Sequence, residues 1–426
     1  MQNMKKAILI DLDGTLTDTA DISFKSMKDG IEETDLTKIK LLNGAVDFVK
    51  ELIKRGHFVF IISDSHPKYV NKIVSNYFGV PSLSLANKPN SAKTRDFLTT
   101  YSTSLQDVTE YFMIGDTWLD IELGRGVGSL TVLTELYKPQ NVEERDGIGQ
   151  DWKNLKSGPT FYANKYSQIL DIIENPTKHL LCAEAVFQNE KTVNAVKFKT
   201  QMYPERFIAY RTLGRQNAGE IDRFAIGDKY FEFGRIDRTP QTLQKLAAGV
   251  EDYINTLLSY ELYNWDFFTY VSDKATTNPP NKMKDFFDIV NVAVPKVRLI
   301  EWKTTVTGSI RNMPNYRQRQ DFVIQNIDIN TNIDLQDKNI VIIDDQFTTG
   351  GTAFAICRKL IDRGAKNLLF LSLFYLVTTV ESERACPHCG TKLQVKINRK
   401  NGNKFYSCVA PQYGGTGCGK FIETIV

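Results

Sequence analysis

No stretch of this 426-residue sequence is long and apolar enough to span a membrane. The longest hydrophobic run, from Asn367 to Val377, has about half the length that a bilayer helix requires. Lysines precede the N-terminal apolar run, but Asp11 ends that run after a few residues, so we expect no secretory signal. The sequence therefore predicts a cytoplasmic protein without a membrane partner.

Cysteine is scarce over most of the chain. Cys182 and Cys357 stand alone, and both are best explained as small buried hydrophobic residues. The other four cysteines lie within the last 41 residues, and such clustering favours a metal site over a disulfide framework. These four are Cys386, Cys389, Cys408 and Cys418.

The net charge is small, +3 over the whole chain, and it is unevenly distributed. Residues 384–426 contain seven basic residues and one acidic residue and so carry +6, which leaves −3 for residues 1–383. The basic character is therefore a local property of the C-terminal segment. With 42% hydrophobic and 24% charged residues, the chain is typical of a globular protein with two or three cores.

Two aspartates, Asp11 and Asp13, follow the first short hydrophobic stretch, Ala7–Ile10. At strand periodicity the two carboxylates project from the same face. One carboxylate could attack phosphorus while the other handles the proton of the leaving group. Gly14 and Thr15 then turn the chain tightly.

This D-x-D-G-T string resembles the first motif of the haloacid dehalogenase (HAD) superfamily phosphatases, and three later features follow in the family's order. The resemblance implies a Rossmann-like domain in which Asp11 is the nucleophile and Asp13 the general acid/base. Ser63, after the apolar run 58–62, and Lys88, before a proline, would bind the phosphoryl group. Lys93 is a weaker alternative to Lys88.

The segment 111–120, Y-F-M-I-G-D-T-W-L-D, resembles the family's acidic metal-binding motif. The resemblance implies a Mg²⁺ ion, whose preference for hard carboxylate oxygens fits these residues. The alternative is that the acidic residues lie at strand ends only for solubility. The implied metal-site residues are Asp11, Asp13, Asp116 and Asp120.

The intervals between the motifs are too short for a large cap domain. We therefore expect an open site, with at most a small helical flap within residues 22–39. A last helix, 166–174, ends at Asn175 and Pro176. The phosphatase-like domain is thus predicted to span residues 1–178.

Residues 179–383 alternate strand-like and helix-like patterns, as a parallel α/β sheet demands. The motif 340–352, I-V-I-I-D-D-Q-F-T-T-G-G-T, reads as a buried strand that ends in two acidic residues and enters a hydroxyl-rich turn before a helix at 353–363. Such a turn directs N–H groups at an anion, while the acidic residues can hold ribose hydroxyls. The expected strands are 195–199, 206–210, 229–233, 267–271 and 297–302, and the expected helices are 239–260 and 282–290.

This motif resembles the phosphoribosyl-pyrophosphate (PRPP) signature of the type I phosphoribosyltransferases. The alternative is an ordinary strand, loop and helix whose acidic residues face water. Thr348 stands where purine-salvage members carry an acidic residue, which argues against a 6-oxopurine acceptor. The implied PRPP-binding residues are Asp344, Asp345, Thr348, Thr349, Gly350, Gly351 and Thr352.

Two further loops resemble parts of the same family. Ser272–Ala275 resembles the pyrophosphate loop, with Lys274 as its cation. The stretch 303–319, with Arg311, Arg317 and Arg319, resembles the mobile loop that covers the reaction centre. For each of these cations, a solvated surface charge is the alternative.

Residues 384–426 resemble the zinc ribbons at the ends of bacterial type I topoisomerases. Cys386 and Cys389 form a knuckle that suits half of a tetrahedral Zn²⁺ site, and Cys408 and Cys418, nine residues apart, would complete it. A hairpin of Lys392–Ile397 and Lys404–Cys408 would join the two halves. His388 is an alternative ligand or a bystander.

The ribbon is either a structural cap or a contact with nucleic acid through its cationic strands and the aromatic residues Phe405, Tyr406 and Tyr413.

Two functions follow from these motifs. The first is a bifunctional enzyme of nucleotide or nucleoside metabolism, a Mg²⁺-dependent phosphatase joined to a PRPP-dependent phosphoribosyltransferase. The second is a sensor of PRPP or another phosphorylated nucleoside or sugar, with a ribbon that holds nucleic acid and a phosphatase that acts on nucleic-acid ends. The second hypothesis would suit a stress response or defence against phage.

Overall fold

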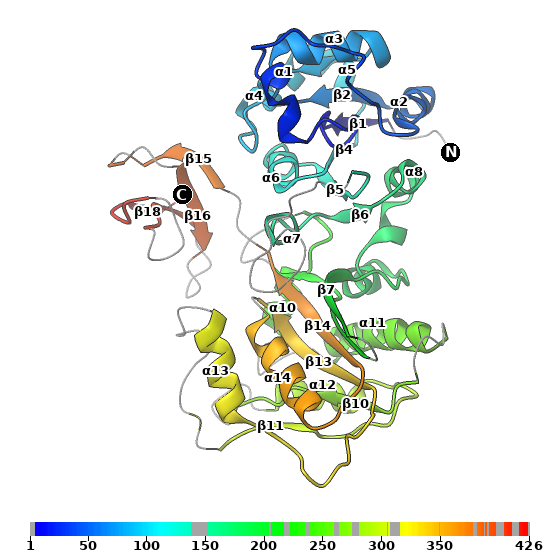
Figure 1. The fold of residues 1–426 in the computed structure, drawn as a ribbon, viewed down its shortest axis with the longest axis vertical. Coiled ribbons are helices and arrows are strands. Elements are labelled where there is room, and N and C mark those ends of the chain that lie inside the picture. Colours follow the sequence, from blue (N-terminus) through cyan, green and yellow to red (C-terminus); the bar gives the residue numbers. More distant parts are fainter. Residues whose placement is uncertain are drawn as a thin grey trace.

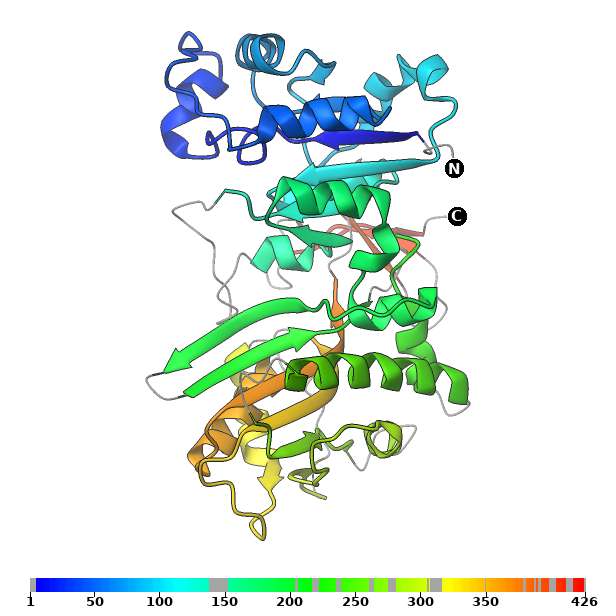
Figure 2. The same cartoon turned by 90° about the vertical axis from the view of Figure 1, so that its right-hand side faces the viewer.

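The computed structural model contains two α/β domains and a small C-terminal β-sheet, which confirms the predicted fold class (Figure 1). Figure 2 shows the two α/β domains following one another along the long axis of the molecule. Among the described residues, none of the helices is both long and apolar enough to cross a membrane. The structure describes residues 5–137, 152–203, 206–216, 222–234, 239–259, 264–274, 281–304, 306, 316–348, 350–377, 381–386, 388–389, 392–397, 404–410 and 417–424.

The first domain is built on a six-stranded sheet of order β3-β2-β1-β4-β5-β6, in which all neighbours are parallel. This is the order of doubly wound sheets, and the direction of winding reverses between β1 and β4. Ligands of such sheets bind beyond the carboxyl ends of the strands at that point. The strands are β1 (Lys6–Ile10), β2 (Phe58–Ile62), β3 (Ser82–Leu83), β4 (Glu110–Gly115), β5 (Leu130–Thr134) and β6 (Phe161–Ala163).

Both faces of this sheet are covered, which explains why its strands are apolar throughout. Alternate residues of β1 enter different cores: Ile8 and Ile10 pack on the side of α2, α3 and α8, and Ala7 and Leu9 on the side of α4 and α6. Between β1 and α2 the chain forms only the short helices η1 and α1, which agrees with the expected small flap. The helices are η1 (Ile22–Phe24), α1 (Lys25–Lys28), α2 (Ala45–Lys54), α3 (Pro67–Tyr77), α4 (Ala92–Thr99), α5 (Ser102–Leu105), α6 (Trp118–Gly126), α7 (Trp152–Lys156) and α8 (Tyr166–Glu174).

The second domain has a six-stranded sheet, in which five strands follow the order β10-β13-β14-β8-β7 and β9 pairs with β14. The interior strand β13 is buried on both faces, with alternate residues in two cores. The predicted boundary at residue 178 falls in η2, between α8 and β7. The strands are β7 (Val196–Tyr203), β8 (Arg206–Thr212), β9 (Arg215–Gln216), β10 (Phe267–Tyr270), β13 (Ile340–Phe347) and β14 (Leu368–Leu376), and the helices are η2 (Pro176–His179), α9 (Cys182–Ala185), η3 (Val186–Gln188), α11 (Pro240–Ser259), α12 (Lys282–Ile289), α13 (Tyr316–Asn326) and α14 (Gly351–Asp362).

Three expectations for the second domain are wrong. The segment 229–233, expected as a strand, is part of helix α10 (Gly227–Phe233), because Tyr230 and Phe233 lie three residues apart and pack on Phe374 and Phe286 from one helical face. The sheet is mixed, since β7 pairs antiparallel with β8. The strand expected at 297–302 contributes β11 (Ile300–Trp302), which pairs antiparallel with β12 (Ile327–Ile329) in a separate two-stranded sheet.

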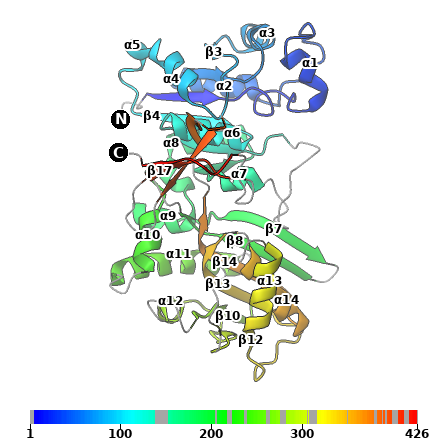
Figure 3. The same ribbon diagram turned by 90° about the vertical axis from the view of Figure 1, so that its left-hand side faces the viewer.

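The C-terminal sheet is antiparallel, with order β15-β16-β17-β18. The hairpin of β16 and β17 agrees with the expected one, and its turn at 401–402 lies outside the described residues. Figures 1 and 3 place this sheet to one side of the two domains, at the level of α6 and α7. The strands are β15 (Glu381–Ala385), β16 (Lys392–Ile397), β17 (Lys404–Ser407) and β18 (Ile422–Thr424).

A buried polar network joins the two α/β domains. The fully buried Arg215 of β9 donates to Glu184 Oε1 at 2.8 Å and to the carbonyl oxygen of Gly158 at 3.2 Å. The same guanidinium forms an ion pair with Asp222, whose carboxylate accepts a hydrogen bond from Thr160 at 2.8 Å. Because Gly158 and Thr160 follow α7 in the first domain, the network holds the two domains in one orientation.

Candidate active sites and metal centres

Three carboxylates meet where the winding of the first sheet reverses. Asp11 directly follows β1, Asp116 directly follows β4, and Asp120 lies in the first turn of α6. One oxygen from each of the three lies within 4.8 Å of the others. The parallel pairing of β1 with β4 brings the first two together, and the tight turn into α6 adds the third.

Lys88 connects two of these carboxylates. Its Nζ donates to Asp11 Oδ1 and, at 2.6 Å, to Asp120 Oδ1, and its side chain is only 5% exposed. Burial opposes a charged ammonium, but the two carboxylates outweigh it and raise the pKa of Lys88 above its usual value. Lys93, the alternative for this role, is exposed and donates to the carbonyl oxygen of Leu85, so only Lys88 of the two lies in the site.

The cluster fits a divalent cation. Burial and the neighbouring Asp120 carboxylate raise the pKa of Asp116 to about 8, and the same two causes raise the pKa of Asp11 well above its usual value. Asp116 Oδ1 is buried without a hydrogen-bond partner in the part of the chain that the structure describes. A Cβ at Gly14 would collide with the Asp116 carboxylate, so the glycine leaves the room that this side chain requires. Three hard oxygen donors with excess negative charge suit Mg²⁺.

Asp13 lies beside this cluster rather than within it. Its Oδ1 accepts hydrogen bonds from Tyr69 at 2.9 Å and Thr19 at 2.5 Å. Its Oδ2 accepts from Ser65 at 2.9 Å and from Ser63 at 3.4 Å. These hydroxyl groups hold the carboxylate of Asp13 in one orientation. The carboxylate lies next to those of the metal site, but it forms its hydrogen bonds with other residues.

A cavity at the carboxyl end of β13 is lined by five of the residues predicted to bind PRPP. Gly350 has the left-handed φ of +80° that a residue with a side chain rarely adopts, and helix α14 begins at Gly351. The dipole of α14 and the backbone N–H groups at its start are therefore directed to one position, as an anion-binding site requires. Thr349 lies outside the described residues. The cavity is lined by Arg319, Asp344, Gln346, Phe347, Thr348, Gly350, Gly351, Thr352, Ala353 and Phe370.

Asp345 has a partner that the sequence pattern does not indicate, Lys282 at the start of α12. Burial opposes ionisation of Asp345, but the Lys282 ammonium outweighs it and keeps the pKa of Asp345 below its usual value. Burial and the charge of Asp345 raise the pKa of Asp344 well above its usual value. Lys274 lies elsewhere, with its Nζ 4.5 Å from the ring centre of Trp302 and 4.8 Å from that of Phe322.

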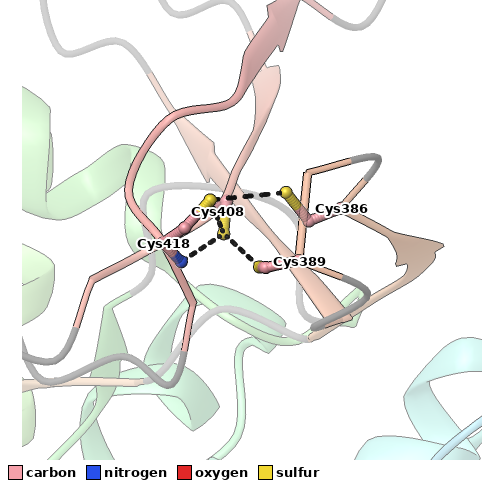
Figure 4. Close-up of side chains that lie close together, drawn as sticks. All are labelled: Cys386, Cys389, Cys408 and Cys418. Atoms are coloured by element: carbon pink, nitrogen blue, oxygen red, sulfur yellow. Dashed lines mark hydrogen bonds between the residues drawn. The ribbon is translucent and has the colours of Figure 1, made fainter.

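The four C-terminal cysteines converge at one point (Figure 4). Three of their Sγ···Sγ separations are 3.6 Å, 3.7 Å and 3.8 Å. A disulfide requires about 2.05 Å, whereas a tetrahedron of thiolates at about 2.3 Å from Zn²⁺ has edges of about 3.8 Å. The geometry therefore fits zinc. His388 is exposed and lies outside the four-sulfur cluster.

Residues that sequence reasoning missed lie close to these sites. Ser65, Tyr69 and Thr19 surround Asp13, Lys282 neutralises Asp345, and Asn154 holds the loop after β4. Ser65 could have been identified from the sequence, because it lies two residues after Ser63, close to the end of β2. The others reach their sites through tertiary contacts, which no local pattern reveals.

No family model matches the chain. Solved structures with similar folds include a predicted phosphoglycolate phosphatase from Haemophilus somnus, at 14% identity and a TM-score of 0.30, covering 41% of this chain and 99% of that one. A predicted phosphatase from Clostridium acetobutylicum has 18% identity and a TM-score of 0.28, covering 39% and 98%. A HAD family hydrolase from Deinococcus radiodurans with bound phosphate and sodium has 14% identity and a TM-score of 0.30, covering 40% and 96%. Each of these matches covers about two fifths of this chain, and the resemblance of the second domain to phosphoribosyltransferases stays a prediction.

Proposed function

We propose that the first domain is a Mg²⁺-dependent phosphomonoesterase. The observation that carries the proposal is the cluster of Asp11, Asp116, Asp120 and Lys88 at the reversal point of a doubly wound sheet. Two buried aspartates, the half-buried Asp116 and one buried lysine form a site that a phosphate group and a divalent cation together would neutralise. A purely structural ion pair would need neither the third carboxylate nor an Asp116 oxygen that has no hydrogen-bond partner among the described residues.

In this proposal Asp11 attacks phosphorus, and the bond from phosphorus to the ester oxygen breaks as the new bond forms. Asp13 gives a proton to the departing oxygen and later takes one from the water that hydrolyses the aspartyl phosphate. Lys88 and Ser63 donate hydrogen bonds to the phosphoryl oxygens. A bound Mg²⁺ ion, held by Asp11, Asp116 and Asp120, would supply positive charge against the phosphoryl oxygens.

For the second domain we propose PRPP binding and transfer of its ribose phosphate to a nitrogenous base. Asp344 and Asp345 would accept hydrogen bonds from the ribose hydroxyls, and the turn before α14 would hold the 5′-phosphate by its amides. Lys282, which pairs with Asp345, would supply positive charge to a departing pyrophosphate. The protein is then a bifunctional enzyme of nucleotide or nucleoside metabolism. The cavity beside Asp344 and the start of α14 supports this part of the proposal.

The transferase proposal predicts PRPP-dependent turnover that is lost with the acidic pair. Zinc-loaded protein with Mg²⁺, PRPP and a panel of purine and pyrimidine bases should release pyrophosphate, measured by a coupled assay. The double variant Asp344→Asn/Asp345→Asn should lose at least roughly 100-fold in rate, because two ligands of the ribose are removed. The matched control is Asp334→Asn/Asp337→Asn, which changes two acidic residues between β12 and β13. Absence of any PRPP-dependent turnover, alongside intact phosphatase activity, would remove the transferase from the proposal.

A second candidate is a sensor whose ribbon binds single-stranded nucleic acid. It is favoured by the +6 charge of residues 384–426, by the exposed Lys420, and by the partly exposed Phe405 and Tyr406. Binding of a fluorescent oligonucleotide should weaken steeply between 50 mM and 200 mM salt, since the contacts would be mainly to phosphates. Deletion of residues 384–426 should abolish it. Salt-independent binding, or binding that survives the deletion, would contradict this candidate.

A further inference from the structure

Asn154 of α7 holds the loop that carries the metal-site carboxylates. Its side-chain oxygen accepts a hydrogen bond from the backbone N–H of Trp118 at 2.6 Å. Its side-chain nitrogen donates to the backbone carbonyl of Asp116 at 3.1 Å. One amide therefore binds the backbone on both sides of Thr117, the N-cap residue of helix α6. Asp116 and Asp120 flank this tie, so its position fixes the spacing between the two carboxylates.

Helix α7 itself belongs as much to the second domain as to the first. Leu155 is 4% exposed and lies in the core that also contains Tyr375 and Val377 of the second domain. The Nζ of Lys156 donates to the carbonyl oxygen of Leu376, the last residue of β14, at 2.8 Å. Successive residues of one short helix thus contact the metal loop on one side and the second domain on the other.

Gly158, two residues after this helix, strengthens the attachment. Gly158 has a φ of +70°, and a Cβ there would collide with the side chain of Val377. Its carbonyl oxygen accepts a hydrogen bond from the buried Arg215 at 3.2 Å. The backbone of the first domain therefore lies against the end of β14 so closely that only glycine fits.

We propose that Asn154 is a positioning residue for the metal site of the first domain, and that the second domain holds it in place through α7. The proposal rests on the proposed function, since it concerns the Mg²⁺ site of the phosphatase. It adds a residue outside the carboxylate cluster, and it makes the second domain part of the phosphatase machinery. Groups that orient metal-binding loops typically affect metal affinity by 10–100-fold.

The same hydrogen bonds predict how loss of the Asn154 amide would affect Mg²⁺ binding and the rate of hydrolysis. Without the Asn154 amide, the Trp118 N–H and the Asp116 carbonyl lose their shared partner, and the loop can rotate at Thr117. Asp116 then no longer keeps its distance from Asp11 and Asp120, which costs Mg²⁺ affinity. Asp11 directly follows β1 and is not part of that loop. The effect should therefore fall on Mg²⁺ binding and less on the rate at saturating Mg²⁺.

The first test is the variant Asn154→Leu, which keeps the approximate shape of the side chain and removes both hydrogen bonds. Its Mg²⁺ dissociation constant, measured by calorimetry on the full chain, should rise by about 10-fold. At saturating Mg²⁺ the phosphatase kcat should stay within about 3-fold of the wild type. The matched control, Asn164→Leu, changes an exposed asparagine of the same domain and should leave Mg²⁺ binding unchanged.

The second test asks whether the second domain contributes to Mg²⁺ binding through α7. Lys156→Met removes the hydrogen bond to Leu376 without touching the metal loop, and it should weaken Mg²⁺ binding by about 3-fold. The control, Lys165→Met, changes an exposed lysine of the first domain. Thermal unfolding of each variant shows whether it is folded, and only folded variants are compared.

Each outcome decides the proposal. Unchanged Mg²⁺ affinity in a folded Asn154→Leu protein would overturn the proposal. If Asn154→Leu weakens Mg²⁺ binding and Lys156→Met does not, the second domain has no part in positioning Asn154. Because Mg²⁺ affinity is measured without turnover, this result is independent of the phosphatase assay. A wild-type protein that binds Mg²⁺ but hydrolyses no phosphomonoester would refute the proposed function while leaving the role of Asn154 to be decided by calorimetry.

Discussion

Replacing Asp11 by asparagine is expected to lower phosphomonoester hydrolysis by roughly 10⁴-fold or more, because the attacking oxygen is lost. The amide has nearly the same shape, and Lys88 keeps its contact with Asp120, so the fold should persist. The measurement is the release of inorganic phosphate from an aryl phosphate at saturating Mg²⁺. Unchanged circular dichroism and thermal unfolding would show that the loss is chemical.

The control for this prediction is Asp96→Asn, which changes an exposed carboxylate on α4 in the same domain. It should hydrolyse the aryl phosphate at the wild-type rate. Retention of more than about a tenth of the activity by Asp11→Asn would contradict a covalent role for Asp11. The cluster of Asp11, Asp116 and Asp120 would then be at most a metal site, and the nucleophile would have to be water.

Replacing Cys408 by serine is expected to abolish zinc binding and unfold the C-terminal sheet. Cys408 Sγ lies 3.6 Å and 3.7 Å from two other sulfurs and accepts a hydrogen bond from the Cys418 N–H, so it is at the centre of the cluster. The buried core around it is small, with Cys386 and Leu393 as its other fully buried members. Structural zinc contributes about 10–16 kcal/mol to small domains of this kind. Such a sheet should not stay folded without it.

The measurements are zinc content by mass spectrometry and amide protection of β16 and β17 by hydrogen exchange. Wild-type protein should hold one zinc per chain with protected amides, and Cys408→Ser should lose both. The control, Cys357→Ala, changes a buried cysteine of α14 and should keep the zinc. Phosphatase activity should survive in Cys408→Ser, because the metal carboxylates belong to a separate core. Protected amides in zinc-free protein would contradict the account.

Much of the two sheets could be predicted from local pattern, because their strands are covered on both faces and therefore read as continuous apolar runs. The runs before Asp11 and Asp344 and the run 58–62 are all strands in the structure. Asp11, Ser63 and Asp116 each directly follow one of these strands, at the edge where ligands of such sheets bind, whereas Asp344 lies within β13.

Other features depend on contacts between distant segments. The run 229–233 has aromatic residues that suit a strand, yet it is helical, because Tyr230 and Phe233 share one face that packs on two other elements. The resemblance implies Asp13 as a metal-site residue, and in the structure its carboxylate accepts hydrogen bonds from three hydroxyl groups of later segments and one of Thr19. Lys282 is 63 residues from its partner Asp345, and Asn154 is 38 residues from its partner Asp116. A local sequence pattern does not extend over such distances.

The central claim is that the chain has two separate phosphate-handling sites. It is tested most directly by ³¹P NMR of one mixture that contains Mg²⁺, PRPP, a panel of bases and an aryl phosphate. The account predicts that Asp11→Asn stops the release of inorganic phosphate from the aryl phosphate but not that of pyrophosphate. Asp344→Asn/Asp345→Asn should do the reverse. If both products form at the wild-type rate in both variants, neither carboxylate cluster is a catalytic site and the account is contradicted.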